Sequence, residues 1–305
     1  MEFNNYHIPV LLDEVINALN LKPEQTVVDA TFGGGGHSRE IAKKIGNGTL
    51  VCIDQDREAL ANGGIRGVRT ELVHDNFSNI NGVLKDLGID KVDAILADLG
   101  VSNHQIDTPE RGFSYTKDAP LDMRMDMGQQ RTAWHVVNQY KTENLERIIR
   151  DYGEERYAKR ISEAITKARP IETTLQLAKV IQNAVPGNYY QTGGHPAKRT
   201  FQAIRIAVND ELAILEKFVK DATNCLKPKG RLAIITFHSL EDRIVKQTMK
   251  HLATECICPP KTPKCICNHH ATLKILTKKP TEATETEQKA NPRSQSAKLR
   301  TAEKI

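Results

Sequence analysis

Four consecutive glycines at positions 33–36 follow a short apolar run and precede a helix-like pattern, which restricts the folds open to the chain. The run at 26–30 (TVVDA) predicts a buried strand, and residues 38–45 predict a helix. Glycines at such a turn permit positive φ and close approach of a ligand, and the start of a helix offers unpaired N–H groups. The run is not a clean G-x-G-x-x-G, because Ser38 takes the last position, and no Gly-Lys-Ser/Thr follows as in a P-loop. We interpret it as a ligand-binding turn rather than as a tight turn with structural glycines alone.

The alternation of strand and helix continues along the first hundred residues. Further buried strands are expected at 49–53, 71–74 and 92–97, with helices at 58–62 and 80–87. From about 104 to 208 the sequence is helical and punctuated by loops, with the clearer helices at 145–152, 158–168, 175–184 and 200–209. The α/β pattern then resumes, with a helix to about 225, a strand at 231–237 and a helix at 238–252.

This order predicts an α/β, Rossmann-like sheet with a mainly helical domain inserted after its fourth strand. Residues 1–103 and 209–305 are expected to form the sheet domain, and residues 104–208 the insertion. Residues 277–297 are rich in Thr, Glu, Lys and Pro and predict a mobile linker. Residues 296–302 are expected to return as an edge strand.

Length and composition exclude several classes of protein. A chain of 305 residues, 39% of them apolar, is long enough to bury a core without a disulfide or metal staple. No apolar run approaches the roughly 18 residues of a membrane span. Six cysteines do not make a disulfide scaffold, and Asp13 and Glu14 interrupt the first apolar segment, which is not a secretory signal. We therefore expect a cytoplasmic protein.

Charge and aromatic residues are unevenly distributed. The net charge is +5, yet the first third of the chain is acidic and the remainder is basic. Six of the seven tyrosines and the single tryptophan lie within 104–208. Basic residues mixed with flat side chains suit RNA, since bases stack on rings and cations meet phosphates. The alternatives are a solvated charged surface and a helical core built from these rings.

Polar side chains follow the predicted strands at the points where they end. Asp54 comes 19 residues after Gly35, where a carboxylate accepts both hydroxyls of a ribose. The third strand ends in His-Asp-Asn-Phe at 74–77, which puts polar groups and Phe77 where an adenine would lie. The fourth ends in Asp98, followed by a glycine turn. This series suits S-adenosylmethionine better than a nicotinamide dinucleotide.

These features and further motifs along nearly the whole chain resemble the bacterial 16S ribosomal RNA (cytosine-N4)-methyltransferase family. The motifs are HIPVLL (7–12), DATFGGGGHS (29–38), DLGVS (98–102), QID (105–107), ERGFS (110–114), PLDMRM (120–125), YGEER (152–156), HPAKRTFQA (195–203) with Arg205, FHSLEDR (237–243) and NPRS (291–294). The resemblance implies a class I methyltransferase that moves a methyl group from S-adenosylmethionine to the exocyclic N4 of a P-site cytidine in 16S rRNA. It implies that the helical insertion recognises the substrate, 16S rRNA or the small ribosomal subunit, with no protein partner and no membrane.

The resemblance also assigns residues to the cofactor. Two departures from the family pattern, Ser102-Asn103 in place of Ser-Ser and the atypical GGIRG at 63–67, touch none of these positions. The carried-over contacts are Gly35, Gly36, His37, Asp54, Phe77, Asp98 and Gln105.

Asp98 is the first candidate for the chemistry at N4. The N4 lone pair is delocalised into the ring, so an enzyme must position the amine and stabilise the charge that develops on nitrogen. A carboxylate that accepts an N4–H bond does this, although Asp98 alternatively serves the methionine amino group. Many amino-methyltransferases have Asp/Asn-Pro-Pro-Tyr here, whereas this chain has Asp-Leu-Gly-Val, so we expect Phe113 or Tyr115 to replace the tyrosine ring. Neither a strong general base nor a metal is required.

The residues expected to meet RNA are mostly basic or aromatic, and several have a second interpretation. The HPAKR segment at 195–199 is either a basic loop for phosphates or simply exposed. The HSLEDR segment at 238–243 either lines the RNA entrance or caps a helix through Ser239. The methionines at 121–127 favour core packing over substrate contact. The candidates are Arg111, Phe113, Tyr115, Arg124, His195, Lys198, Arg199, His238 and Arg243.

A cysteine-rich segment lies outside these motifs. Its C-x-C pairs are tighter than the C-x₂₋₄-C of most structural zinc sites, so a zinc site and a set of free or oxidised thiols both remain open. Cys52 and Cys225 are expected in the core. The segment comprises Cys256, Cys258, Cys265 and Cys267, with His269 and His270 after them.

Two other functions remain open: a small-subunit assembly factor without catalysis, and a nicotinamide-dependent dehydrogenase. The intact glycine run, Asp54 and Asp98 count against the first, and the lack of a clean G-x-G-x-x-G counts against the second.

Overall fold

A computed structural model of the chain describes residues 9–61, 63–189, 194–259 and 265–305. The chain divides into two compact units, Met1–Gly100 with Leu212–Ile305, and Val101–Glu211. Parts of the sequence-based expectations, at His7, Ile8, Asn62, Tyr190 and Gly193, lie outside the described residues. Among the helices that the structure does describe, none is both long and apolar enough to cross a membrane.

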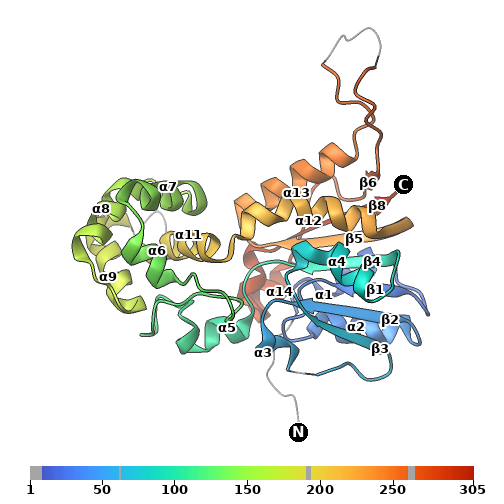
Figure 1. The fold of residues 1–305 in the computed structure, drawn as a ribbon, viewed down its shortest axis with the longest axis horizontal. Coiled ribbons are helices and arrows are strands. Elements are labelled where there is room, and N and C mark those ends of the chain that lie inside the picture. The colour runs from blue at the N-terminus through green and yellow to red at the C-terminus, as the bar shows by residue number, and fades with distance from the viewer. Residues whose placement is uncertain (1–8, 62, 190–193, 260–264) are drawn as a thin grey trace. The chain divides into compact units, whose positions relative to one another are not determined.

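The first unit is built on one mixed sheet, whose strand order is β3-β2-β1-β4-β5-β8-β6, with β7 also paired to β8 (Figure 1). Strands β1 to β5 run parallel, whereas β8 is antiparallel to β5, β6 and β7. The predicted α/β sheet is therefore confirmed. The strands are β1 Thr26–Asp29, β2 Thr49–Asp54, β3 Arg69–His74, β4 Val92–Asp98, β5 Leu226–Thr236, β6 Leu273–Ile275, β7 Thr281–Glu282 and β8 Lys298–Lys304.

Two apolar cores lie on the two faces of this sheet, because the central strands are buried on both sides. Val28 of β1 belongs to the core shared with α4, α12 and α13, and Val27 to the core shared with α1 and α2. This double burial explains why the central strands are nearly continuous apolar runs. The helices of this unit are α1 Leu12–Leu19, α2 Gly36–Ile45, α3 Arg57–Leu60, α4 Ile80–Asp86, α12 Glu211–Cys225, α13 Ser239–Leu252 and α14 Glu285–Ala290, with short 3₁₀ turns η1 Phe77–Asn79 and η4 Pro292–Ser296.

The C-terminal segment differs from the sequence-based expectation in two ways. Residues 277–297, predicted as a mobile linker, contain β7, α14 and η4. They are held by tertiary contacts: Oε1 of Glu287 accepts the N–H of Leu11 at 2.7 Å, and Ala283 and Ala297 are buried. The strand predicted at 296–302 exists as β8, but it lies between β5 and β6 rather than at the edge.

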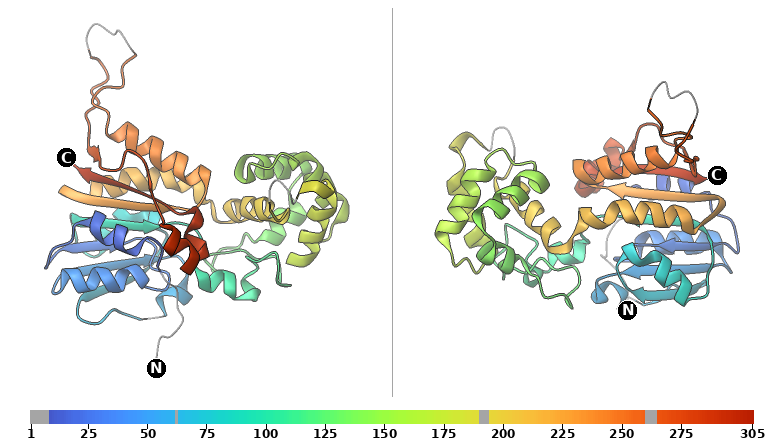
Figure 2. Two further views of the ribbon diagram at one scale, coloured as in Figure 1. Left: turned by 180° about the vertical axis from the view of Figure 1, so that it is seen from behind. Right: turned by 45° about the horizontal axis from the view of Figure 1, so that its top comes forward.

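The second unit is helical, as the two views of Figure 2 show, and its buried apolar side chains form a core of their own. The rings that the sequence suggested for RNA mostly belong to this core. Tyr189 and Phe201 are buried in it, and Phe113, Tyr115, Trp134, Tyr140, Tyr152 and Tyr157 pack against it. The methionines at 123 and 125 are also buried, as expected for core packing, whereas Met127 is 46% exposed, and for it the expectation is wrong. The elements are α5 Asn103–Asp107, η2 Pro109–Arg111, α6 Ala133–Gln139, α7 Thr142–Gly153, α8 Ala158–Ala168, α9 Thr174–Ala184, η3 Gly187–Tyr189 and α11 Ala197–Asn209.

Candidate active site

Three aspartates end three neighbouring strands at one edge of the sheet. Asp29 ends β1, Asp54 ends β2 and Asp98 ends β4. Since β1 pairs in parallel with both β2 and β4, these carboxylates come to the same edge. In open parallel sheets this carboxyl edge is where ligands bind.

The glycine run forms the turn between β1 and α2 and contacts one of these aspartates. Gly33 and Gly35 have φ of +51° and +70°, a region that favours glycine. The N–H of Gly33 donates to Oδ2 of Asp54 at 2.7 Å. Gly35 is the N-cap of α2, so the turn leads directly into the helix start. The glycine turn and Asp54 therefore lie together at this edge of the sheet.

Asp54 combines burial with unused acceptor capacity. Its Oδ1 accepts the N–H of Asp56 at 2.8 Å, and its Oδ2 accepts that of Gly33. A carboxylate has about four lone-pair sites, so one site on each oxygen remains for a ligand donor. Burial raises the pKa of Asp54 to about 6, against the opposing effect of these hydrogen bonds.

Asp98 faces His37 from the end of β4. Oδ2 of Asp98 lies 3.7 Å from Nδ1 of His37, and Nε2 of His37 lies 2.9 Å from the carbonyl oxygen of Val10. Burial, followed by repulsion from Asp29 and Glu241, raises the pKa of Asp98 well above its usual range. Within the described part of the chain, Oδ1 of Asp98 is buried and accepts no hydrogen bond. Leaving a buried acceptor unpaired costs roughly 1–3 kcal/mol, so this atom is the clearest indication of a ligand.

Asp29 is a site residue that sequence reasoning did not single out. Its side chain is buried and accepts hydrogen bonds from Oγ of Ser38 at 2.6 Å and from the N–H of Thr31 at 3.3 Å. Burial raises its pKa to about 6, and its charge in turn raises the pKa of Asp54 and Asp98. The sequence did contain an indication of this role, because Asp29 also ends a buried strand directly before the glycine turn.

The two remaining predicted cofactor contacts lie in different units. Phe77 follows β3, is partly buried and meets Phe218 edge to face, with ring centroids 4.8 Å apart. Gln105 belongs to the second unit, where it is buried and its Oε1 accepts the N–H of Ser102 at 3.1 Å in a capping box at the start of α5.

Comparison with known proteins decides the family. A model of the MraW methylase family matches residues 4–305. The chain belongs to the MraW methylase family. Membership confirms the methyltransferase identified from the sequence motifs, with its class I fold and its S-adenosylmethionine cofactor.

Relatives of this methylase match over their full length. A protein from Clostridioides difficile named ribosomal RNA small subunit methyltransferase H is 51% identical, with 100% of both chains covered. One of the same name from Halothermothrix orenii is 51% identical, with 98% of both chains covered. A solved structure of an rRNA methylase from Streptococcus thermophilus is 12% identical, covers 96% of this chain and 93% of its own, and has a TM-score of 0.41.

Two of the residues predicted to contact RNA, Arg111 and His238, are buried and already make structural contacts within this methylase. Arg111 is 3% exposed, and its Nη2 donates to backbone carbonyl oxygens at 124–125. His238 is almost buried and is the N-cap of α13, where its Nδ1 accepts the N–H of Glu241 at 3.4 Å. The helix cap considered as the alternative is present, but His238 and Glu241 form it rather than Ser239.

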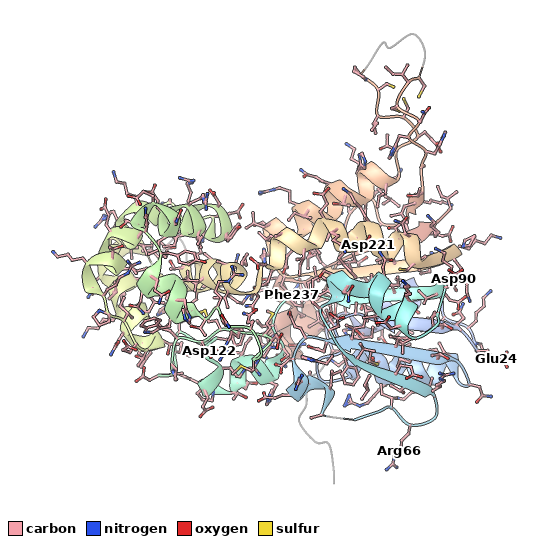
Figure 3. All side chains as sticks on the ribbon, in the orientation of Figure 1. Glu24, Arg66, Asp90, Asp122, Asp221 and Phe237 are labelled. Carbon is pink, nitrogen blue, oxygen red and sulfur yellow. The ribbon has the colours of Figure 1, made fainter. Side chains whose placement is uncertain are left out.

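The guanidinium of Arg124 is already used within its own loop. Its Nη2 lies 2.7 Å from Oδ2 of Asp122, which Figure 3 labels, and its Nε donates to Oδ1 at 2.9 Å. Its Nη1 donates to the carbonyl oxygens of Met127 and Gln129. Arg124 therefore holds the 122–129 loop, and its contact with RNA stays a prediction.

The other candidates lie where RNA can reach them more readily. Lys198 and Arg199 are exposed on α11, although Nη1 of Arg199 donates to the carbonyl oxygen of Glu154 at 2.7 Å. His195 is half-buried and stacks on Tyr115, with centroids 4.6 Å apart. Phe113 packs against the helical core. In the first unit, Arg243 is exposed on α13.

Proposed function

We propose that this methylase transfers the methyl group of S-adenosylmethionine to the exocyclic N4 of a P-site cytidine in 16S rRNA. The relatives named ribosomal RNA small subunit methyltransferase H support the substrate class. The observation that carries the proposal is the buried, unpaired Oδ1 of Asp98 at the ligand-binding edge of the sheet. An amine such as cytosine N4 is the kind of donor that this atom lacks.

The neighbouring residues suit the cofactor. Asp54 keeps one acceptor site on each oxygen for the two hydroxyls of a ribose, and the turn through Gly33 to Gly36 lets the ligand approach the backbone. Phe77 offers a ring beside the expected adenine position. Gln105 is assigned to the cofactor by family resemblance alone.

In this reaction the protein mainly positions the two reactants and stabilises the charge that develops on the amine. The bound cofactor supplies an electrophilic methyl group on a cationic sulfonium. A positive charge near Asp98 lowers the pKa that burial has raised, which favours the carboxylate. The carboxylate then accepts an N4–H bond and stabilises the positive charge that develops on the amine as its bond to the methyl carbon forms and the methyl–sulfur bond breaks. The sulfur would leave as a neutral thioether, and the methylated amine would lose its extra proton to water. His37, 3.7 Å away, positions Asp98 from the other side.

Gly35→Ala is expected to weaken cofactor binding tenfold or more. At a φ of +70° the new Cβ costs about 1–2 kcal/mol of backbone strain, and it would lie 2.9 Å from the ring of Phe32. Gly88→Ala is the matched control, because Gly88 has a φ of +69° but nothing within 4 Å of its Cβ position. Calorimetric titration with S-adenosylmethionine should show the loss only in Gly35→Ala. Equal affinities in the two variants would contradict the role of the turn.

Lys198→Ala is expected to raise the KM for the RNA substrate several-fold and to leave kcat unchanged. An exposed lysine that meets a phosphate adds affinity without taking part in chemistry, and its loss reduces the slope of log affinity against log salt by about one. Lys179→Ala, which removes an exposed lysine of α9 in the same unit, is the control. If both variants behave alike, the basic segment at 195–199 is not an RNA contact.

The decisive experiment is nucleoside analysis of small-subunit rRNA from a strain that lacks this gene. We expect N4-methylcytidine to disappear and to return with the wild-type gene but not with Asp98→Asn. An unchanged level in the deletion strain would overturn the proposal. An assembly factor without catalysis would show no binding of S-adenosylmethionine to the purified protein. Family membership removes the dehydrogenase from consideration.

A further inference from the structure

The segment between α13 and β6 brings four cysteine side chains to one point. The Sγ atom of Cys265 lies 3.6 Å from that of Cys256, 4.0 Å from that of Cys258 and 3.5 Å from that of Cys267, and Cys256 and Cys267 are 3.7 Å apart. All four sulfur atoms lie within 4.8 Å of one another. The two C-x-C pairs therefore meet, although residues outside the described part of the chain separate them.

These distances match a tetrahedron of thiolates around a single ion. With metal–sulfur bonds of about 2.3 Å, the sulfur atoms of a tetrahedral zinc site lie about 3.8 Å apart. A disulfide needs its sulfur atoms at about 2.05 Å, and all four cysteines are free thiols.

Two further contacts fit a metal site. The N–H of Ile266 donates to Sγ of Cys258 at 3.4 Å, the kind of outer hydrogen bond that stabilises a metal-bound thiolate. His269 is not among the side chains that gather here, and its Nε2 lies 3.0 Å from the carbonyl oxygen of His251. The ligand set is thus four sulfurs, which favours soft ions such as zinc over calcium or magnesium.

We propose that Cys256, Cys258, Cys265 and Cys267 bind one zinc ion as four thiolates. Four protein ligands leave no open position, so the site is structural rather than catalytic. This inference is independent of the methyl-transfer reaction and of the residues at the sheet edge.

The described residues of this segment do not form an apolar core. Ile257 and Ile266 are 48% and 77% exposed, and no other described residue between 254 and 270 is buried. Its base is closed by a hydrogen bond from the N–H of Thr272 to the carbonyl oxygen of Leu252 at 2.8 Å. A metal ion supplies the cross-link that such a segment needs beyond this base, as in small zinc-dependent folds.

The test is metal analysis of the full-length protein purified from cells grown without added metal. Mass spectrometry of the elements should find about one zinc per chain, reduced tenfold or more in Cys265→Ser and in Cys256→Ser. Cys225→Ser is the control, because Cys225 is a free cysteine outside the cluster, where it donates to Oδ1 of Asn81. It should keep its zinc. All variants should retain binding of S-adenosylmethionine, since the site at the sheet edge is separate.

A second measurement on the wild-type protein does not depend on how the variants fold. Titration with a mercurial reagent should release the zinc as four thiols react, and replacement by cobalt should give the intense visible bands of a tetrahedral thiolate site. Iron in place of zinc, four thiols that react at once with no metal present, or a disulfide among them would each overturn the proposal.

Discussion

Asp54→Ala is expected to weaken binding of S-adenosylmethionine several hundredfold. Each oxygen of Asp54 already accepts one backbone N–H and keeps one site for a ribose hydroxyl. Loss of two hydrogen bonds to a charged acceptor costs about 3–4 kcal/mol, which corresponds to this change in Kd. Calorimetric titration of the purified protein measures it directly.

Asp93→Ala is the matched control for this variant. Asp93 lies near the other end of β4, where its Oδ2 accepts the N–H of Thr26 and a bond from Nζ of Lys227, each at 2.9 Å. Like Asp54→Ala, the Asp93→Ala variant removes a carboxylate that accepts a backbone N–H. Asp93, however, is remote from the carboxyl edge of the sheet. The assignment of Asp54 fails if the two variants bind the cofactor equally well.

The hydrogen bonds that Asp54 is expected to accept from the cofactor make cofactor affinity depend on pH. Burial raises the pKa of Asp54 to about 6, and only the ionised carboxylate offers all of its acceptor sites. Cofactor affinity is therefore expected to rise by up to about tenfold per unit as pH increases from about 5, and to level off near pH 7. Asp54→Asn should remove the rise. A rise that survives in Asp54→Asn would contradict this assignment and point to Asp29 or Asp98, whose pKa values are also raised.

Asp98→Asn is expected to lower kcat about 100- to 1,000-fold, the usual effect of removing one group that stabilises developing charge. The amide keeps the shape of the side chain but loses its charge, so the amine is stabilised less as its positive charge develops. Affinity for S-adenosylmethionine should change by less than about threefold. Single-turnover methyl transfer and calorimetric titration separate the two quantities.

The alternative role of Asp98, binding the methionine amino group, predicts the opposite pattern. Affinity for the cofactor would then fall strongly, and the single-turnover rate at saturating cofactor would change little. Asp56→Asn is a suitable control, since Asp56 is buried beside Asp54 and caps α3 by accepting the N–H of Glu58. Asparagine caps helices about as well as aspartate, so this variant removes a nearby charge at little structural cost.

The central parallel strands β1, β2, β4 and β5 were predictable because burial on both faces makes each one a short apolar run. Strand β3 was predicted as buried, but none of its residues is buried. The predicted strand at 26–30 corresponds to β1, and that at 231–237 to the second part of β5. The segment at 277–297 was not predictable in this way. Helix α14 has no buried residue, and a contact between Glu287 and Leu11, 276 positions apart, anchors it. A local pattern cannot show such a partner.

In the candidate site, too, some features could be predicted from local sequence and others depend on the tertiary fold. Asp54 and Asp98 could be predicted because the end of a parallel strand determines the edge at which a side chain lies. Arg111, Arg124 and His238 were assigned to RNA because they are basic, but backbone carbonyls, Asp122 and a helix end already engage them. Sequence shows the charge of a side chain, whereas only the fold shows which groups already use its donors.

The position of β8 inside the sheet has a consequence for how the protein reaches its native state. The strand joins β5, more than sixty residues earlier, to β6 and β7, so the contact order of the sheet is high and its completion is a slow step. Until residues 298–304 arrive, β5 presents an open, apolar edge that can pair with another chain. Fragments that stop before Lys298 are thus expected to aggregate, because only β8 covers this edge of β5 in the described structure.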